Sequence, residues 1–338
     1  VANWAILDGF TVTKGAATNA VNNEFGYGGG IYCDNGIIAI RNCIVTNNLA
    51  SYRGGGIYIE SVAGKHLITN CFIASNSVVG AGTSGGGGMH IVGPAIDIYN
   101  TTFVTNTTLG TARGGACYLD HNTDTGKFFN CAFYYNVSAH YGGAINHFDG
   151  NLEFRDTVFG WNRSGNYGGA VHVDDAGQTG TYYTCTFASN SSPERGGAVA
   201  IENVLATGPT LFSNCMFTAN SESGTAATDG GGAVWAGQGM GLTFIGCVLS
   251  NNAAAQDGGA IRQYSTAATD QPFTLQNSTL HGNTAGNVGG ALSIGTVNAT
   301  KLVTNCVFRN NVATGNGGAI YDGIGPNALI LDSDFSGN

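Results

Sequence analysis

The chain has little charge and no long apolar run. Of its 338 residues, 10% are Asp, Glu, Lys or Arg, and the formal net charge is −9. This acidic balance argues against nucleic acid and against an anionic membrane surface as partners. No apolar stretch approaches the roughly 20 residues that a membrane-spanning helix needs. The nine cysteines include no Cys-x-x-Cys pair, so their spacing gives no sign of a metal site.

Glycine is abundant, and much of it belongs to a phrase that repeats along the whole chain. One copy is the segment 130–136, with the sequence NCAFYYN, followed by GGAI at 142–145. An internal repeat of about 30 residues is typical of a solenoid. Aligned on Cys131, twelve copies follow one another at intervals of 26 to 33 residues, with Phe10, Cys43, Cys71, Thr101, Cys131, Thr157, Cys185, Cys215, Cys247, Ser278, Cys306 and Ser333 at the aligned position.

Apolar residues recur at fixed offsets from the aligned position. The residue two places later is apolar in every copy, for example Phe133 and Phe187, and so is the residue three places earlier. The first offset predicts a half-buried strand, whereas the second breaks the period of two and requires a bend. The residue just before the aligned position is Asn, Asp or Gly in every copy except at Thr184. These residue types tolerate the left-handed backbone of a tight corner.

Asparagine fills a second recurrent position, five places after the aligned one. Gly15 occupies it in the first copy and asparagine in the other eleven. We interpret this position as a second corner, and its repetition predicts an asparagine ladder running from copy to copy. The asparagines are Asn48, Asn76, Asn106, Asn136, Asn162, Asn190, Asn220, Asn252, Asn283, Asn311 and Asn338.

Each copy thus contains three short strands, the last of which opens with the Gly-Gly phrase. So small a unit cannot bury its own apolar face, so copies must stack with equivalent strands paired in parallel. We predict an all-β fold: a single-stranded right-handed parallel β-helix of about twelve coils, with three short strands per coil. The hand follows from the usual hand of parallel crossovers. Because the repeat is unbroken, we expect one domain over residues 1–338, with uncapped ends.

The pairing of a GGA-apolar phrase with an F-x-x-N phrase resembles the repeats of a known family. This is the polymorphic outer-membrane protein family, together with related bacterial right-handed β-helix surface proteins. The resemblance covers nearly the whole chain. It implies a β-helix that is extracellular or displayed at the cell surface, and it implies no single activity, because the family's members are surface and adhesive proteins.

Seven of the nine cysteines occupy the aligned position, where Thr and Ser replace them in other copies. We interpret them as small buried spacers. Stacked neighbours such as Cys185 and Cys215 would have Cα atoms about 4.8 Å apart, but their parallel Cα–Cβ bonds would keep the Cβ atoms near that distance, beyond the roughly 3.8 Å of a disulfide. We therefore predict free thiols.

The residue after the apolar one in each Gly-Gly strand is expected to point outward, and acidic residues lie two places further on in several copies. An aromatic stripe beside an acidic one suits sugar binding, because rings stack on pyranose faces while carboxylates accept hydrogen bonds from hydroxyls. The alternative, which we favour, is that these aromatics are good strand formers that stack on each other. The candidate ligand-binding residues in this column are Tyr32, Tyr58, His90, Tyr118, His172 and Trp235.

Asp174, Asp175 and Glu202, with His172 alongside, are the candidate catalytic residues of a glycosidase. Retaining glycosidases place two carboxyl groups about 5 to 5.5 Å apart, close to the spacing of neighbouring coils. However, the chain lacks the Gly-His-Gly and Arg-Ile-Lys phrases of β-helix pectin hydrolases, and we find no basic residue beside the cluster to act as a lyase base. We favour solvated surface carboxylates.

One loop offers oxygen ligands at alternate positions, as calcium loops do: Asp120, Asn122 and Asp124. The following glycine comes one place late and no glutamate stands at the twelfth position, so we favour an ordinary polar turn, with Ca²⁺ as the alternative. No other cofactor is expected.

Function is constrained mainly by the repeat. Neither end has a polar cap, which predicts either an excerpt of a longer chain or end-to-end self-association into a filament. Our leading hypothesis is a non-catalytic extracellular or cell-surface structural protein: an adhesin, a stalk or a filament subunit. A polysaccharide-binding or polysaccharide-degrading protein is the alternative, with extracellular glycans as partners.

Overall fold

The computed structural model describes residues 4–19, 24–62, 64–80, 82–93, 96–174, 180–202, 209–237, 240–264, 272–295, 299–323 and 328–338, with the backbone alone at 121–124. These residues form strands and turns, apart from one short 3₁₀ helix, η1 (Glu24–Gly26). They divide into two compact units, Val1–Gly165 (unit 1) and Asn166–Asn338 (unit 2). Each unit is described by itself, so a single domain over residues 1–338 stays a prediction.

Four sets of strands recur in each unit. The A set follows the Gly-Gly phrase, the B set precedes the first corner, the C set contains the apolar residue two places after the aligned position, and the D set has only two residues per strand.

In unit 1, the A set is β4 (Ile31–Asp34), β8 (Ile57–Glu60) and β12 (Met89–Gly93), and the B set is β1 (Trp4–Asp8), β5 (Ile37–Arg41), β9 (His66–Thr69) and β13 (Ile96–Tyr99). β16 (Cys117–Phe129) and β19 (Ile145–Arg155) run through both positions without a break. The C set is β2 (Thr11–Thr13), β6 (Ile44–Thr46), β10 (Phe72–Ala74), β14 (Thr102–Val104), β17 (Ala132–Tyr134) and β20 (Val158–Gly160), and the D set is β3 (Ala16–Ala17), β7 (Leu49–Ala50), β11 (Ser77–Val78), β15 (Thr107–Thr108) and β18 (Val137–Ser138).

In unit 2, the A set is β21 (Val171–Val173), β25 (Val199–Ile201), β29 (Val234–Ala236), β33 (Ile261–Tyr264), β37 (Leu292–Gly295) and β41 (Ile320–Asp322), and the B set is β22 (Gly180–Tyr183), β26 (Thr210–Ser213), β30 (Leu242–Ile245), β34 (Phe273–Gln276), β38 (Lys301–Thr304) and β42 (Leu329–Leu331). The C set is β23 (Thr186–Ala188), β27 (Met216–Thr218), β31 (Val248–Ser250), β35 (Thr279–His281), β39 (Val307–Arg309) and β43 (Asp334–Ser336), and the D set is β24 (Ser191–Ser192), β28 (Ser221–Glu222), β32 (Ala253–Ala254), β36 (Thr284–Ala285) and β40 (Val312–Ala313).

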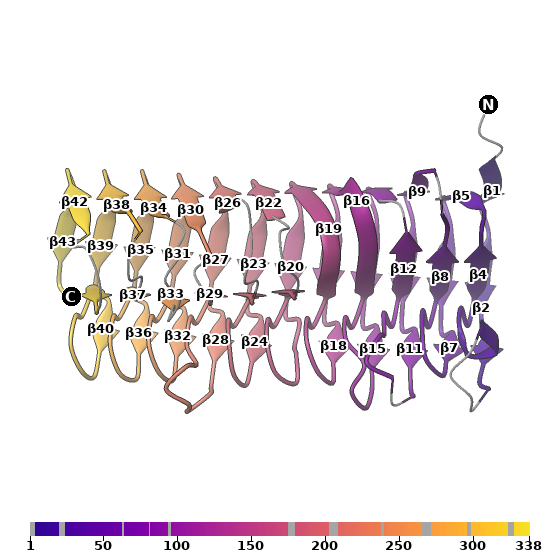
Figure 1. The fold of residues 1–338 in the computed structure, drawn as a ribbon, viewed down its shortest axis with the longest axis horizontal. Helices are drawn as coiled ribbons and strands as arrows, with labels where there is room; N and C mark the ends of the chain where they lie inside the picture. Colours follow the sequence, from indigo (N-terminus) through magenta and orange to yellow (C-terminus); the bar gives the residue numbers. More distant parts are fainter. Residues whose placement is uncertain are drawn as a thin grey trace. The chain divides into compact units, whose positions relative to one another are not determined.

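Within each unit, strands of a set pair in parallel with their equivalents in the next turn (Figure 1). The register aligns like positions: Phe133 pairs with Phe103 and with Phe159, and in unit 2 Phe187 pairs with Phe217. The predicted all-β parallel solenoid is therefore confirmed. Its right-handedness stays a prediction.

The number of strands per turn is higher than predicted. We expected three short strands in each of about twelve coils, whereas the D strands add a fourth. The reason is that after most of the asparagines five places beyond the aligned position the chain continues in extended form for two residues. These residues pair with a neighbouring turn, as Ser77–Val78 does with Leu49–Ala50 and with Thr107–Thr108. Each unit has five D strands, which gives about ten complete turns.

Like residues stack in the interior of each unit. The Phe133 ring lies between those of Phe103 and Phe159, with centroids 4.7 and 5.0 Å apart, and Phe187 stacks on Phe217 at 4.6 Å. All five rings are fully buried. Burying a phenylalanine is worth roughly 1.5 to 3 kcal/mol, and an offset aromatic pair adds about 1 kcal/mol, so the repeated apolar column contributes strongly to the stability of each turn.

The first corner lies where the sequence predicts it. Asn42, Asn70, Asn100 and Asn130 have φ between 49° and 54°, in the left-handed region. Their exposed side chains also bond from turn to turn, for instance from Asn130 Nδ2 to Asn100 Oδ1 at 2.8 Å.

The second corner is displaced by one residue from its predicted place. The left-handed residue is the one before the interior asparagine, for example Thr105 with φ of 51° before Asn106. This conformation turns the asparagine side chain inward, where Asn106 Nδ2 donates to Asn136 Oδ1 at 3.0 Å and to the carbonyl of Ile73 at 2.9 Å. The asparagine ladder is confirmed within each unit, and in unit 2 the same contact joins Asn220 to Asn252 at 3.0 Å.

All nine cysteines are free thiols in the structure, and eight of them are buried. Those at the aligned position donate to backbone carbonyls, as Cys131 Sγ does to the carbonyl of Ile98 at 3.5 Å. Burial raises the pKa of Cys131 to about 12, which keeps this thiol protonated and unreactive at neutral pH.

Candidate functional site

The outward column of the A strands is not exposed, contrary to expectation. The exposed fraction is 0% for Tyr58 and His172, 1% for His90, 2% for Trp235 and 5% for Tyr118, against 41% for Tyr32. The prediction that these side chains face solvent is therefore wrong for five of the six.

The segment that precedes each Gly-Gly phrase covers this column. In unit 1, His90 Nδ1 lies 3.1 Å from the carbonyl of Gly85. In unit 2, Trp235 Nε1 donates to the carbonyl of Thr228 at 2.9 Å. Side-chain alternation predicts which strand residues point away from the interior of the solenoid. It does not predict that a loop without a repeated sequence pattern buries them.

In unit 1 the covered column is aromatic. Tyr58 stacks on Tyr32 and on His90 with centroids 5.4 Å apart in both cases, and His90 stacks on Tyr118 at 4.7 Å. Burial lowers the pKa of His90 to about 3, so its ring is neutral in the stack. The favoured interpretation, that these aromatics stack on each other, describes this geometry. Glycan binding by the column stays a prediction. Tyr32 is the residue of the column whose ring is exposed and could stack on a sugar.

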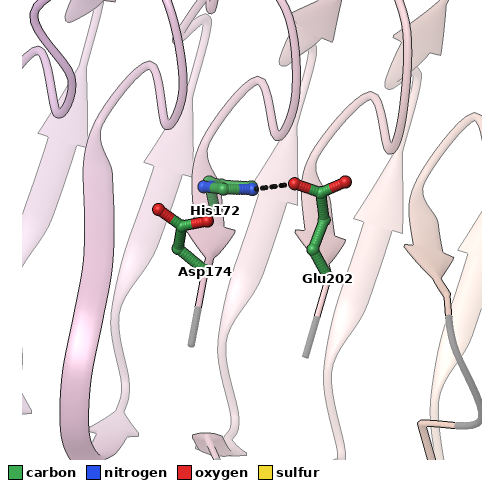
Figure 2. A group of neighbouring side chains, drawn as sticks. All are labelled: His172, Asp174 and Glu202. Atoms are coloured by element: carbon green, nitrogen blue, oxygen red, sulfur yellow. Dashed lines mark hydrogen bonds and ion pairs between the residues drawn. The ribbon is translucent and has the colours of Figure 1, made fainter. Parts of the chain in front are cut away.

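In unit 2 the column brings together His172, Asp174 and Glu202, three of the four candidate catalytic residues (Figure 2). One ligand atom from each lies within 4.8 Å of the other two. His172 Nε2 is 3.2 Å from Glu202 Oε2, and His172 is fully buried while the two carboxylates are half-buried. Asp175, the fourth candidate, lies outside the described residues.

Parallel register explains this convergence. Val173 of β21 pairs with Ile201 of β25, and the Glu202 amide donates to the Val173 carbonyl at 2.9 Å, so the residue after each strand sits beside its counterpart. His172 and Asp174 lie two positions apart and so share one side of the chain.

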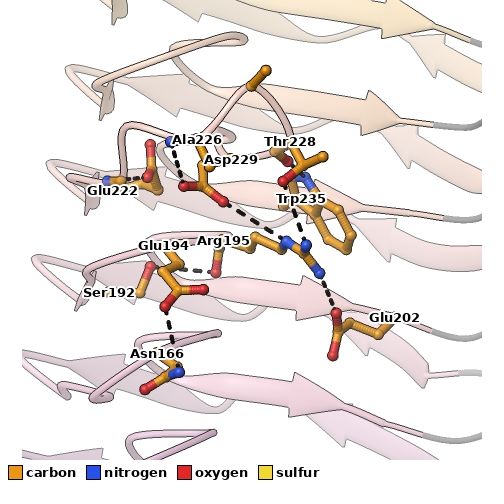
Figure 3. A network of polar contacts seen from close by, with 12 residues as sticks. Asn166, Ser192, Glu194, Arg195, Glu202, Glu222, Ala226, Thr228, Asp229 and Trp235 are labelled. Carbon is orange, nitrogen blue, oxygen red and sulfur yellow. Dashed lines mark hydrogen bonds and ion pairs between the residues drawn. The ribbon is translucent and has the colours of Figure 1, made fainter.

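Arg195 is a residue of this cluster that the sequence analysis did not predict. Its Nη1 donates to Glu202 Oε1, and its Nε lies 3.8 Å from Asp229 Oδ1 (Figure 3). Its guanidinium also lies 4.6 Å from the Tyr167 ring centroid and 4.7 Å from that of Trp235. The expectation that no basic residue flanks the acidic cluster is therefore wrong.

A signal for Arg195 is present in the sequence. Arg53, Arg113 and Arg195 each stand directly before a Gly-Gly pair, and tyrosine takes this place in a neighbouring copy. The pairs stack in space: Arg53 lies 5.0 Å from the Tyr27 ring centroid, and Arg113 lies 4.5 Å from that of Tyr141. Arginine in one copy and tyrosine at the same position of a neighbouring copy thus predict cation–π stacking between the segments that precede the two Gly-Gly pairs.

Glu202 is held in its ionised form. Burial opposes ionisation, but the hydrogen bond and charge of His172 and the guanidinium of Arg195 outweigh it and lower the pKa of Glu202 overall. The carboxylate therefore acts as a hydrogen-bond acceptor on both of its oxygens.

The calcium alternative concerned a polar loop at Asp120, Asn122 and Asp124. In the structure these residues belong to β16, with shifts in its register against β19 between Leu119 and Asp120 and between Asp120 and Thr125. The predicted turn is thus a distorted strand. The side chains of Asn122 and Asp124 lie outside the described residues, so a calcium site there stays a prediction.

Two segments of the chain, residues 42–60 and 305–322, match the family model of the Chlamydia polymorphic membrane protein repeat. These two segments are similar to that repeat. Each match runs from the first corner through a C, a D and an A strand, so the polymorphic membrane protein repeat corresponds to one structural portion of the turn. This bears out the resemblance seen in the sequence and supports a surface localisation in general terms. No curated protein and no solved structure is significantly similar to the chain. In the described part of the chain, nothing helical has the length and apolar character of a membrane-spanning segment.

Proposed function

We propose that the chain is a non-catalytic β-solenoid displayed at the cell surface, where it acts as an adhesin, a stalk or a filament subunit. The observation that carries the proposal is the repetition of one register and one set of stacked columns from turn to turn within each unit. In such a repeat, added turns lengthen the structure while each turn keeps the same neighbour contacts. The polymorphic membrane protein repeat supports the surface location.

The electrostatics of the acidic cluster favour this proposal over a glycosidase. A glycosidase needs a carboxyl group whose pKa is raised, so that it can protonate the leaving oxygen. Glu202 has the opposite shift, because His172 and Arg195 stabilise its charged form. Its carboxylate is therefore poorly suited to act as the general acid.

A polysaccharide panel separates the two functions. We expect no release of reducing ends by the purified chain, and we expect beads coated with it to adhere to cell layers more than albumin-coated beads. The Glu202→Gln variant should adhere as well as the parent. Release of sugar that disappears in Glu202→Gln would instead establish the enzyme.

Glycan binding without catalysis is the remaining alternative, and Tyr32 tests it. Among the six candidate residues of the column, the ring of Tyr32 is the exposed one. If the column binds sugars, Tyr32→Ala should abolish glycan-array binding, whereas substitution of the buried Tyr118 should have a smaller effect.

Negative-stain microscopy of the purified chain distinguishes a stalk from a filament. A stalk should give rods of one length, and a filament should give fibres of many lengths.

A further inference from the structure

The cluster of His172, Asp174 and Glu202 combines one imidazole with two carboxylates. Hard ions such as Ca²⁺ prefer six to eight oxygen ligands, whereas a mixed nitrogen and oxygen set suits a borderline ion such as Zn²⁺. The cluster therefore has the donor chemistry of a transition-metal site. Binding of a metal ion goes beyond the structural function proposed above.

The distances suit a four-coordinate ion. With metal–ligand bonds of about 2.0 to 2.2 Å, two ligands of a tetrahedral ion lie roughly 3.3 to 3.6 Å apart. His172 Nε2 and Glu202 Oε2 are 3.2 Å apart, close to that spacing, and all three ligand atoms lie within 4.8 Å of one another. Small rotations of the half-buried carboxylates would bring the set to bonding distance, with water completing the coordination.

The surroundings orient the ligands. Arg195 binds Glu202 Oε1 and so leaves Oε2 facing His172, as Figures 2 and 3 show. The guanidinium of Arg195 itself contacts the rings of Tyr167 and Trp235. Partners behind the ligands that fix their orientation are typical of metal centres. The backbone of β21 and β25 fixes the ligands further, because both strands are paired in the sheet.

We propose that His172, Asp174 and Glu202 form a binding site for a borderline divalent transition-metal ion, with Zn²⁺ as the representative ion. Binding replaces the contact between His172 and Glu202 by two bonds to the metal. The imidazole must then offer the lone pair of Nε2, so a proton on Nε2 of the neutral ring moves to Nδ1, and an imidazolium releases one proton to solvent.

The test is calorimetric titration of Zn²⁺ into tag-free, metal-free, reduced protein carrying Cys33→Ser, which removes the half-buried thiol. We expect one Zn²⁺ per chain, and a loss of affinity of about tenfold or more in Asp174→Asn and in Glu202→Gln. Ca²⁺ in excess should not displace the ion. Failure to bind Zn²⁺ in the parent, or unchanged affinity and stoichiometry in both variants, would overturn the proposal.

Unit 1 offers a matched control. Asp34 and Glu60 pair in register on β4 and β8, and Asp174 and Glu202 take the same places after β21 and β25, but Tyr32 stands in unit 1 where His172 stands in unit 2. Asp34→Asn combined with Glu60→Gln should leave Zn²⁺ binding unchanged, and a loss of binding there would also overturn the assignment. Zn²⁺ should raise the melting temperature of the parent and fail to raise that of Asp174→Asn, whose own melting temperature without metal shows whether it is folded.

Discussion

The interior columns and the covered A-strand column are both buried, but they are built differently. In the interior, like meets like: phenylalanine stacks on phenylalanine at 4.6 to 5.0 Å, and asparagine bonds to asparagine. In the covered column, Tyr58 meets His90, and in unit 2 His172 meets a glutamate that an arginine also binds. Interior side chains pack mainly against the neighbouring turns, whereas those of the covered column also meet a loop that differs from copy to copy. The same residue type therefore has to recur from copy to copy only at positions whose side chains pack against their own equivalents in the neighbouring turns.

Removal of an interior asparagine should have the largest effect. In Asn106→Ala, the amides of Asn76 and the carbonyl of Ile73 lose their buried partner. Each buried group left without a hydrogen bond costs about 1 to 3 kcal/mol, so we expect a loss of about 5 kcal/mol in the free energy of unfolding, measured by urea denaturation.

The control for this substitution is an exposed asparagine of the first corner. Asn100→Gly keeps the left-handed backbone and removes only exposed hydrogen bonds, so its effect should stay below about 1 kcal/mol. Equal effects of the two substitutions would show that the interior ladder contributes no more than the exposed one.

The covering segment should respond to pH. Glu222, at the end of β28, is buried beside Asp229, and burial raises the pKa of its carboxyl group to about 8. The amides of Gly224 and Ala255, which donate to its oxygens, only partly oppose this rise. Between pH 4.5 and about 8 the folded protein therefore holds a proton that the unfolded chain releases.

The consequence is a loss of stability as the pH rises through this window. The unfolded state binds fewer protons, so the free energy of unfolding should fall by an amount on the order of 4 kcal/mol between pH 4.5 and 8. Glu222→Gln should flatten this dependence in melts recorded across the pH range. Parallel profiles for the parent and the variant would show that Glu222 ionises normally in the fold.

The same comparison explains what the sequence could predict. The aligned cysteines, the phenylalanines and the asparagines repeat because they touch their own equivalents, so periodicity alone predicts the parallel solenoid. The register that brings Asp174 beside Glu202 follows from the same periodicity. The burial of His172 and Trp235 does not, because the covering segments vary in length and sequence. Arg195 was missed for this reason, although arginine and tyrosine stand before the Gly-Gly pairs of neighbouring copies in three places.

Arg195 should contribute less to stability than the interior ladder. Arg195→Lys keeps the positive charge beside Glu202 but loses the planar group that lies against Tyr167 and Trp235. We expect a loss of about 1 to 2 kcal/mol in the free energy of unfolding. Arg163→Lys is the control: Arg163 is exposed, and its substitution should change stability by less than about 0.5 kcal/mol. A loss in Arg163→Lys as large as that in Arg195→Lys would remove the role assigned to the stacking.

Alkylation should distinguish the buried cysteines of the interior from the half-buried Cys33, and it requires no substitution that alters the stability of the fold. Cys33 is half-buried, and the other eight cysteines are buried. Burial raises the pKa of Cys71 to about 11 and that of Cys131 to about 12, so little reactive thiolate forms at these positions near pH 8. Iodoacetamide applied to the folded protein without reductant should add one group, at Cys33, and none in Cys33→Ser.

After unfolding without reductant, the intact mass should show nine additions, because the parallel stacking of the aligned cysteines keeps them from forming disulfides. Fewer than nine would reveal a disulfide, and several additions to the folded protein would show that the cysteine column opens to solvent.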